Sequence, residues 1–132
     1  MFKHVVMWKL GGGDAAARSH NAARLKAEFE SLRGRVPGLL HIEVGIDESH
    51  VDYACDVVLY TEFASRQALL DYAENPEHLR VRQRLGDMRT ARHQVDYEVS
   101  HEAAHADRDP PLPAGVSAGH PPGDTDHVQA LR

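Results

Sequence analysis

Residues 40–60 read LHIEVGIDESHVDYACDVVLY, and this stretch decides the fold. Apolar and polar residues alternate from Leu40 to Ile46, which is the period of a half-buried strand. A polar turn follows, and residues 57–60 are then apolar on both sides, which indicates a strand covered on both faces. The middle of the chain therefore predicts two consecutive strands.

Helices are predicted before and after these two strands in the chain. Asp14 is placed to cap a first helix, which Pro37-Gly38 ends. Ser65 is placed to cap a second helix, and Asn75-Pro76 breaks it, with Asn as N-cap and Pro as the first residue of a new helix. The apolar positions of the first helix are Ala22, Leu25, Phe29, Leu32 and Val36.

The first and last strands of the domain are predicted at residues 2–10 and 93–99, where β-branched and aromatic residues alternate with polar ones. The resulting order β-α-β-β-α-β is the split βαβ arrangement, an α+β, ferredoxin-like fold with a four-stranded antiparallel sheet and its helices on one face. The other face then exposes an apolar patch, and a second copy of the chain is its simplest cover, because a two-fold dimer buries the same patch twice. The patch consists of Val5, Met7, Val58, Tyr60, Val95, Tyr97 and Val99.

The chain is predicted to divide near residue 100. Residues 1–100 carry these elements, whereas residues 101–132 hold five of the seven prolines and no aromatic residue, and are interpreted as a flexible tail. The tail contains an H-E-x-x-H zinc motif, His101-Glu102-Ala103-Ala104-His105. Pro110-Pro111 cuts off a long helix there and no core shapes a cleft, so no metal site is predicted.

Composition and charge narrow the function. The net charge of −5 argues against a nucleic-acid partner, and no apolar run is long enough for a membrane helix. The single cysteine, Cys55, allows no disulfide within the chain and nothing resembles a signal peptide, so a cytoplasmic location is expected. One basic run is interpreted as the solvated side of a helix rather than as a site for an anion. It consists of Arg80, Arg82, Arg84, Arg89 and Arg92.

Five short motifs occur in a characteristic order. They are Met1-Phe2-Lys3-His4-Val5-Val6, Val36-Pro37-Gly38-Leu39, Asp71-Tyr72, Asn75-Pro76-Glu77-His78-Leu79 and Val95-Asp96-Tyr97-Glu98. Together they resemble the stress-responsive A/B barrel (Dabb) family over residues 1–99, and the resemblance implies a dimeric α+β barrel. One plant branch, of the olivetolic acid cyclase type, cyclises polyketides with a histidine and a tyrosine that match His78 and Tyr72. Where that branch has a further histidine and another tyrosine, this chain has Val57 and Phe29.

The alternation along the strands also predicts a pocket. His4 and Asp96 are expected under the helices, where a buried polar group costs free energy unless it has a partner. His78 lies in the first turn after Pro76 and Tyr72 ends the preceding helix, so both can point into the same space. We predict His78 as a general base, Tyr72 as donor to a carbonyl oxygen and Asp96 as the group that orients His78. Substrate contacts are predicted from His4, Val6, Trp8, Phe29 and Leu59.

Such a site suits cyclisation or isomerisation of an enolisable, polyketide-like carbonyl compound without a cofactor. The alternative is a non-catalytic dimer that holds an apolar or aromatic small molecule, or none, with His78 bonded to backbone groups and Tyr72 in the core. The sequence leaves both open, and the volume of the pocket distinguishes them.

Overall fold

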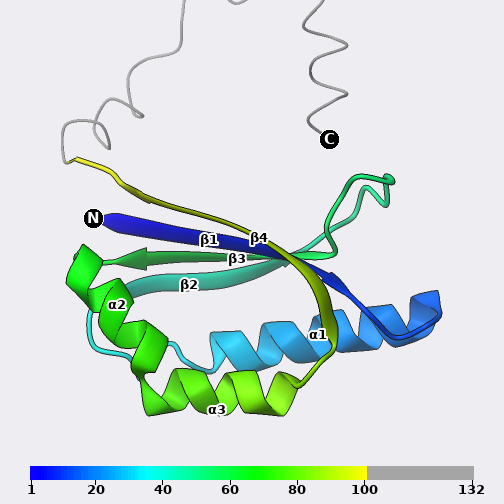
Figure 1. Cartoon of the computed structure of the whole chain (residues 1–132), viewed down its shortest axis with the longest axis horizontal. Helices are drawn as coiled ribbons and strands as arrows, with labels where there is room; N and C mark the ends of the chain where they lie inside the picture. Colours follow the sequence, from blue (N-terminus) through cyan, green and yellow to red (C-terminus); the bar gives the residue numbers. More distant parts are fainter. Residues whose placement is uncertain (101–132) are drawn as a thin grey trace, which may run out of the picture.

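The computed structural model describes residues 1–100, which form an antiparallel sheet with helices on one side (Figure 1). The sheet order is β2-β3-β1-β4, and each neighbouring pair is antiparallel, so the predicted ferredoxin-like α+β fold is confirmed. In chain order the elements are β1 (Phe2–Leu10), α1 (Ala15–Glu30), β2 (Leu39–Ile46), β3 (Val57–Phe63), α2 (Arg66–Glu74), α3 (Pro76–Leu85) and β4 (Arg89–Glu98). The predicted tail, residues 101–132, and its H-E-x-x-H motif lie outside the described residues.

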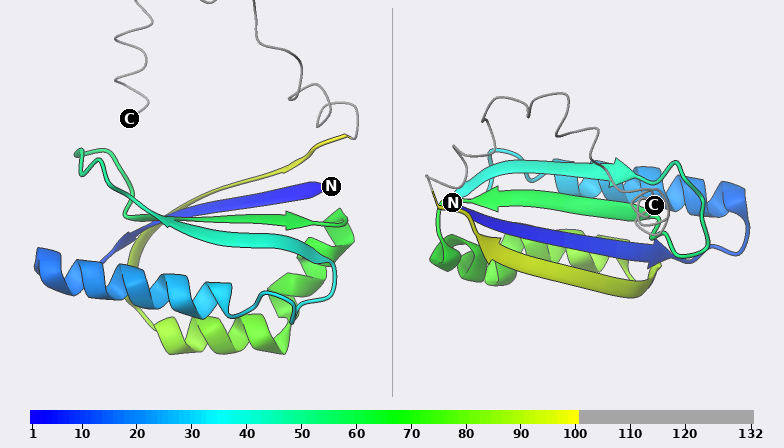
Figure 2. Two further views of the ribbon diagram at one scale, coloured as in Figure 1. Left: turned by 180° about the vertical axis from the view of Figure 1, so that it is seen from behind. Right: turned by 90° about the horizontal axis from the view of Figure 1, so that it is seen from above.

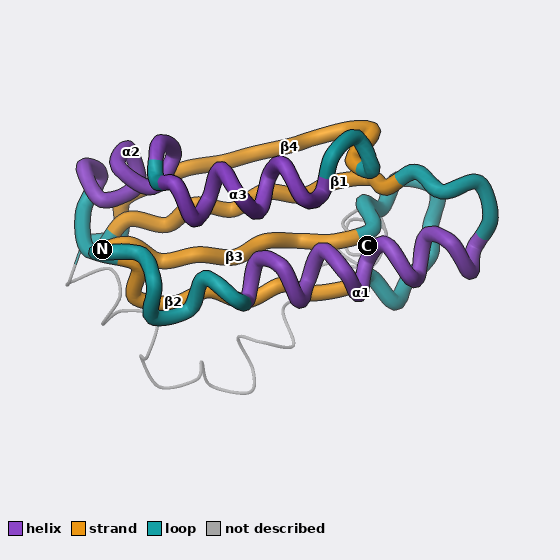
Figure 3. Tube along the Cα trace, turned by 90° about the horizontal axis from the view of Figure 1, so that it is seen from below, coloured by secondary structure: helices purple, strands orange, loops and turns teal. Residues whose placement is uncertain are grey.

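The three helices cover a single face of the sheet. Figures 2 and 3 show α1 and α3 running alongside each other beneath the strands, while α2 lies across the end at which β1 begins. The loop between β2 and β3 projects on the opposite side (Figure 1). Within residues 1–100, no helix has the length and apolar composition of a membrane span.

The helix starts follow the predicted caps. The side chain of Ser65 accepts a hydrogen bond from the amide of Ala68, and that of Asn75 accepts one from Glu77, with Pro76 in the first turn of α3. These bonds satisfy amides that have no partner within the helix, so the break between α2 and α3 is built into the sequence.

The prediction for the end of α1 is wrong. The helix ends at Glu30, where Ser31 caps it, and not at Val36. The hydroxyl of Ser31 donates to the carbonyl of Glu28 at 2.6 Å, and Gly34 has a positive φ of 78°, so the chain leaves the helical conformation early. Val36 is still buried in the core.

Alternation along the strands assigns side chains to the two faces as predicted. Val6, Trp8 and Leu59 are buried under the helices, whereas Met7 and Val95 on the other face are 42% and 54% exposed. Trp8 stacks on Phe29 of α1 with ring centroids 5.3 Å apart. This stacking joins β1 to α1. The opposite face of the sheet remains apolar and uncovered in a single chain.

Candidate functional site

A cavity of about 280 Å³ lies between the helix face of the sheet and helices α2 and α3. Residues from six elements line it, so it depends on the whole fold rather than on one loop. The eight residues predicted from the sequence all line it: His4, Val6, Trp8, Phe29, Leu59, Tyr72, His78 and Asp96. The structure therefore brings these side chains together, while their chemical roles stay a prediction.

One wall of the cavity carries a histidine–carboxylate pair. His4 on β1 lies directly opposite Asp96 on β4, and Nδ1 of His4 is 2.6 Å from Oδ1 of Asp96. The His4 side chain is 8% exposed and that of Asp96 is 30% exposed. Since the carboxylate accepts the proton-bearing Nδ1–H, it holds the imidazole in the tautomer that leaves Nε2 as an acceptor.

The predicted partner of Asp96 is wrong. Asp96 orients His4 and not His78, because the antiparallel pairing of β1 and β4 places His4 and Asp96 side by side. The second carboxylate oxygen, Oδ2, accepts from Nε2 of Gln94 at 2.9 Å, and Arg92 donates to Oε1 of Gln94. Arg92, Gln94 and Asp96 thus form a hydrogen-bonded row along β4 that ends at His4.

This row faces the helices but is not buried beneath them. Gln94 and Asp96 were expected to be covered, and the structure leaves both accessible to solvent. The reason is the sheet order, in which β4 is an edge strand. The carboxylate therefore needs less compensation than a fully buried one.

Tyr72 and His78 form another part of the cavity lining. Their rings stack with centroids 4.1 Å apart, across the break between α2 and α3. Tyr72 is 2% exposed, and its hydroxyl has no hydrogen-bond partner within residues 1–100. Burial raises the pKa of Tyr72, against the opposing charges of Arg92 and Arg82, so the hydroxyl stays protonated and able to donate.

His78 is a neutral imidazole near neutral pH. Burial lowers the pKa of His78 to about 4, with the positive charge of Arg82 acting in the same direction and the nearby backbone of Ala73 and Tyr72 opposing it. Its Nδ1 is buried and forms no hydrogen bond to the described residues. A neutral histidine with such a low pKa is a weaker proton acceptor than a histidine of ordinary pKa.

Arg82, Arg89 and Arg92 line the cavity although they were not predicted as site residues. Arg82 and Arg92 are exposed, in agreement with the interpretation of the basic run as solvated, but Arg89 is only partly exposed, and Arg89 and Arg92 lie on β4 rather than on a helix. Two signals pointed to them. Arg82 lies one helical turn after His78, and Arg92 shares the alternation of Gln94 and Asp96 on β4.

No metal site is apparent in the described part of the chain, where no three His, Cys, Asp or Glu side chains group to hold an ion. The chemistry available in the cavity is thus that of its side chains: an oriented imidazole, a protonated phenol and a neutral imidazole, beside the apolar surfaces of Val6 and Leu59. This set can take a proton from carbon and hold the charge that develops on an oxygen.

The sheet order, the helix layer and the cavity beneath it define a ferredoxin-like α+β protein. Residues 2–99 match the family described as Stress responsive A/B Barrel Domain (Dabb), and the chain belongs to this family.

Solved structures share this fold. The chain is similar to a dimeric ferredoxin-like protein of unknown function from Bacteroides fragilis, with 27% identity and a TM-score of 0.67 over 74% of this chain and 95% of that one. A dimeric ferredoxin-like protein of unknown function from Jannaschia sp. is 23% identical, with a TM-score of 0.60 over 74% of this chain and 98% of that one. Hydroxynitrile lyase from Passiflora edulis is 12% identical, with a TM-score of 0.63 over 76% of this chain and 94% of that one. The latter two structures, at 23% and 12% identity, show only that the fold is shared. Among curated proteins none matches this sequence.

Proposed function

We propose that this protein is a cofactor-independent enzyme that moves a proton at the carbon next to a carbonyl group of a small molecule. The observation that carries the proposal is the His4–Asp96 pair, at 2.6 Å, in the same cavity as the unpartnered hydroxyl of Tyr72. The His4 and Tyr72 rings make a T-shaped contact with centroids 6.3 Å apart, so one small molecule in the cavity can touch both side chains.

Each step of the reaction has a group to perform it. Nε2 of His4 takes the α-proton, and the electron pair of the broken C–H bond forms the C=C bond of an enolate. The hydroxyl of Tyr72 donates to the enolate oxygen, where the negative charge develops. The proton then returns to a different atom, which is isomerisation. In the other outcome the enolate carbon attacks a second carbonyl of the same molecule, which closes a ring, and the His4 imidazolium gives its proton to the alkoxide that forms.

The geometry favours His4 over His78 as the base. Asp96 orients His4 and stabilises its positive charge after proton transfer, as the carboxylate does in other histidine–carboxylate pairs. His78, with its low pKa, is assigned to the wall that holds the ring of Tyr72. This assignment replaces the predicted role of His78 as the base.

We further propose that the protein acts as a homodimer in the cytoplasm. The sheet face opposite the cavity exposes Met7, Val95 and Tyr97, which a second copy covers by two-fold packing. The similar proteins from Bacteroides fragilis and Jannaschia sp. are dimeric. The cytoplasmic location rests on the single cysteine, Cys55.

The test is exchange of α-protons for deuterium, followed by proton NMR in heavy water with phenylpyruvate and the neutral ketone 1-phenylpropan-2-one. Asp96→Asn is expected to lower the enzyme-dependent exchange rate by about 10²- to 10⁴-fold, because the imidazole of His4 loses its orientation and its counter-charge. The matched control is Glu43→Gln, which removes the carboxylate of the exposed pair His41–Glu43, 2.9 Å apart on β2.

Equal exchange rates in the wild type and in Asp96→Asn contradict the assignment of His4 as the base. If His78→Gln loses exchange and Asp96→Asn does not, the base is His78. If both compounds bind and neither exchanges, the alternative of a non-catalytic binding protein replaces the proposal. The apolar walls formed by Val6, Trp8 and Leu59 support that alternative.

A further inference from the structure

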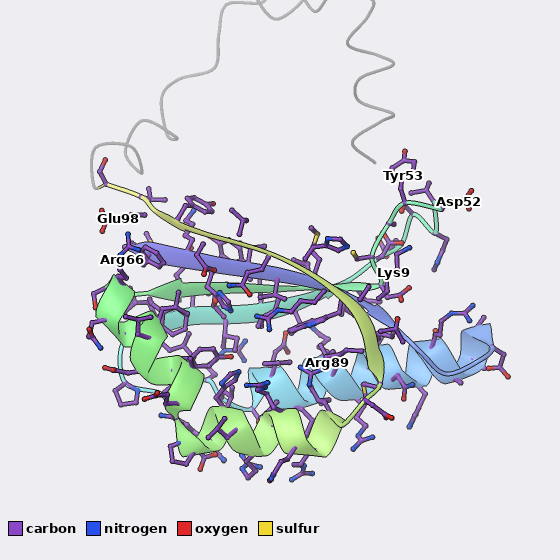
Figure 4. All side chains as sticks on the ribbon, in the orientation of Figure 1. Lys9, Asp52, Tyr53, Arg66, Arg89 and Glu98 are labelled. Atoms are coloured by element: carbon purple, nitrogen blue, oxygen red, sulfur yellow. The ribbon has the colours of Figure 1, made fainter. Side chains whose placement is uncertain are left out.

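Three arginines gather at one part of the cavity. Arg82 lies on α3, and Arg89 and Arg92 are among the first residues of β4, the next element in the chain. Together with Trp8 they also line an adjoining, more open groove, so they stand where the cavity meets solvent. Figure 4 shows the labelled Arg89 on the helix side of the sheet, at the start of β4.

These arginines differ from their neighbours in lacking a carboxylate partner. Arg80 and Arg84 of the same helix form ion pairs with Glu77 at 2.7 Å and with Glu28 at 3.0 Å. Within residues 1–100, Arg82 and Arg89 form no ion pair, and Arg92 donates to the neutral side chain of Gln94.

The acidic group of the same cavity does not neutralise them. Both oxygens of Asp96 are engaged, by His4 and by Gln94. The three arginines line one groove, and burial together with the charges of Arg82 and Arg92 lowers the pKa of Arg89. Such a cluster in a chain with a net charge of −5 is a local feature and not a consequence of composition.

We propose that Arg82, Arg89 and Arg92 form an anion subsite, so that the ligand of this cavity carries a carboxylate or a phosphate at the arginines and places its apolar body beside Trp8. Guanidinium groups present paired N–H donors that match the oxygens of such anions. The cavity of about 280 Å³ is at the small end for a ligand pocket, which fits a body of about one ring.

The subsite also orients the ligand toward the reacting groups. Tyr72, Arg82 and Arg92 line the same cavity, so an anion held by the arginines shares that cavity with Tyr72. The substrate class that follows is a small oxo acid whose carbonyl group is near its anionic end. This statement rests on the proposed function, whereas binding of the anion can be tested without any turnover.

Trp8 supplies the signal for the test. It is the only tryptophan of the chain, it lines the cavity, and the guanidinium of Arg89 lies 5.6 Å from its ring centroid. Its fluorescence is therefore followed while the full chain is titrated with benzoate, with phenyl phosphate, and with benzamide as the neutral analogue of benzoate.

We expect at least one of the two anions to bind about tenfold or more tightly than benzamide, and to bind more weakly as salt is raised, because the interaction is electrostatic. Arg82→Gln and Arg92→Gln should each weaken the binding of that anion by about three- to tenfold and leave benzamide unchanged. Arg84→Gln is the control, since Arg84 lies on the same helix and pairs with Glu28. The two anions distinguish a carboxylate from a phosphate ligand.

Equal affinity for the anions and benzamide overturns the proposal, as does an Arg84→Gln variant that weakens anion binding as much as Arg82→Gln. The first comparison uses the wild type alone and does not depend on the folding of a variant. Selective anion binding without deuterium exchange retains the subsite and rejects the proposed reaction. Exchange of the neutral ketone with no anion selectivity retains the reaction and rejects the subsite.

Discussion

The hydroxyl of Tyr72 allows the sharpest test, because function and stability predict changes of opposite sign. The side chain is 2% exposed and its hydroxyl has no partner within residues 1–100, so it is buried without a protein hydrogen bond. A buried hydroxyl left unpaired costs about 1–3 kcal/mol of folding free energy. The native structure therefore carries a cost that a residue selected only for packing would avoid.

The substitution Tyr72→Phe removes this cost and keeps the ring. The ring retains its contacts with Phe63, at 5.1 Å between centroids, and with His78, at 4.1 Å. We expect the free energy of unfolding to rise by about 1 kcal/mol, the lower end of the cost of an unpaired buried hydroxyl. The α-proton exchange should fall by about 10²- to 10³-fold, as it does when one donor to an oxyanion is removed.

Chemical denaturation measures the first quantity and deuterium exchange the second. The control is Tyr60→Phe, because the hydroxyl of Tyr60 donates to Glu62 at 2.6 Å. Its loss should lower stability by about 0.5–1 kcal/mol and leave exchange intact. A Tyr72→Phe variant that is less stable than the wild type by a similar amount refutes the unpaired hydroxyl, and unchanged exchange refutes its role at the oxyanion.

Three other predictions concern pH, assembly and domain limits. Because the pKa of His78 falls from its ordinary 6.5 to about 4 on folding, the unfolded chain binds the proton first, and stability should fall as pH drops from 6.5 to 4. After a discount for solvent screening this loss is about 1–2 kcal/mol, and His78→Gln should remove it from a series of denaturation curves. Val95, 54% exposed on the uncovered sheet face, should tolerate Asp in the folded monomer but not in the dimer, so sedimentation of Val95→Asp should show monomers with unchanged circular dichroism. A chain that ends at Ser100 should keep the melting temperature and dimer mass of the full chain, since the family match ends at residue 99; a clear fall in either would show that residues 101–132 contribute to folding or assembly.

Much of the fold follows from local signals in the sequence. The alternation in β1 assigns Val6 and Trp8 to the covered face and Met7 to the other, because successive side chains of a strand point to opposite sides. The cap at Asn75 and the following proline set the break between α2 and α3, since these residues satisfy or remove the first free amides of a helix. These patterns also bring Tyr72 and His78 to one cavity, because both lie beside that break.

Tertiary structure alone decided which groups act on one another. Strand alternation assigns Asp96 to a face, but its partner depends on the register between β1 and β4, and His4 lies 92 residues away in the chain. Register is a property of the hydrogen-bonded ladder between two distant strands, so no period in either strand contains it. The same holds for the arginines: Arg82 and Arg92 belong to different elements, and only the folded arrangement of α3 and β4 around the cavity brings their charges together.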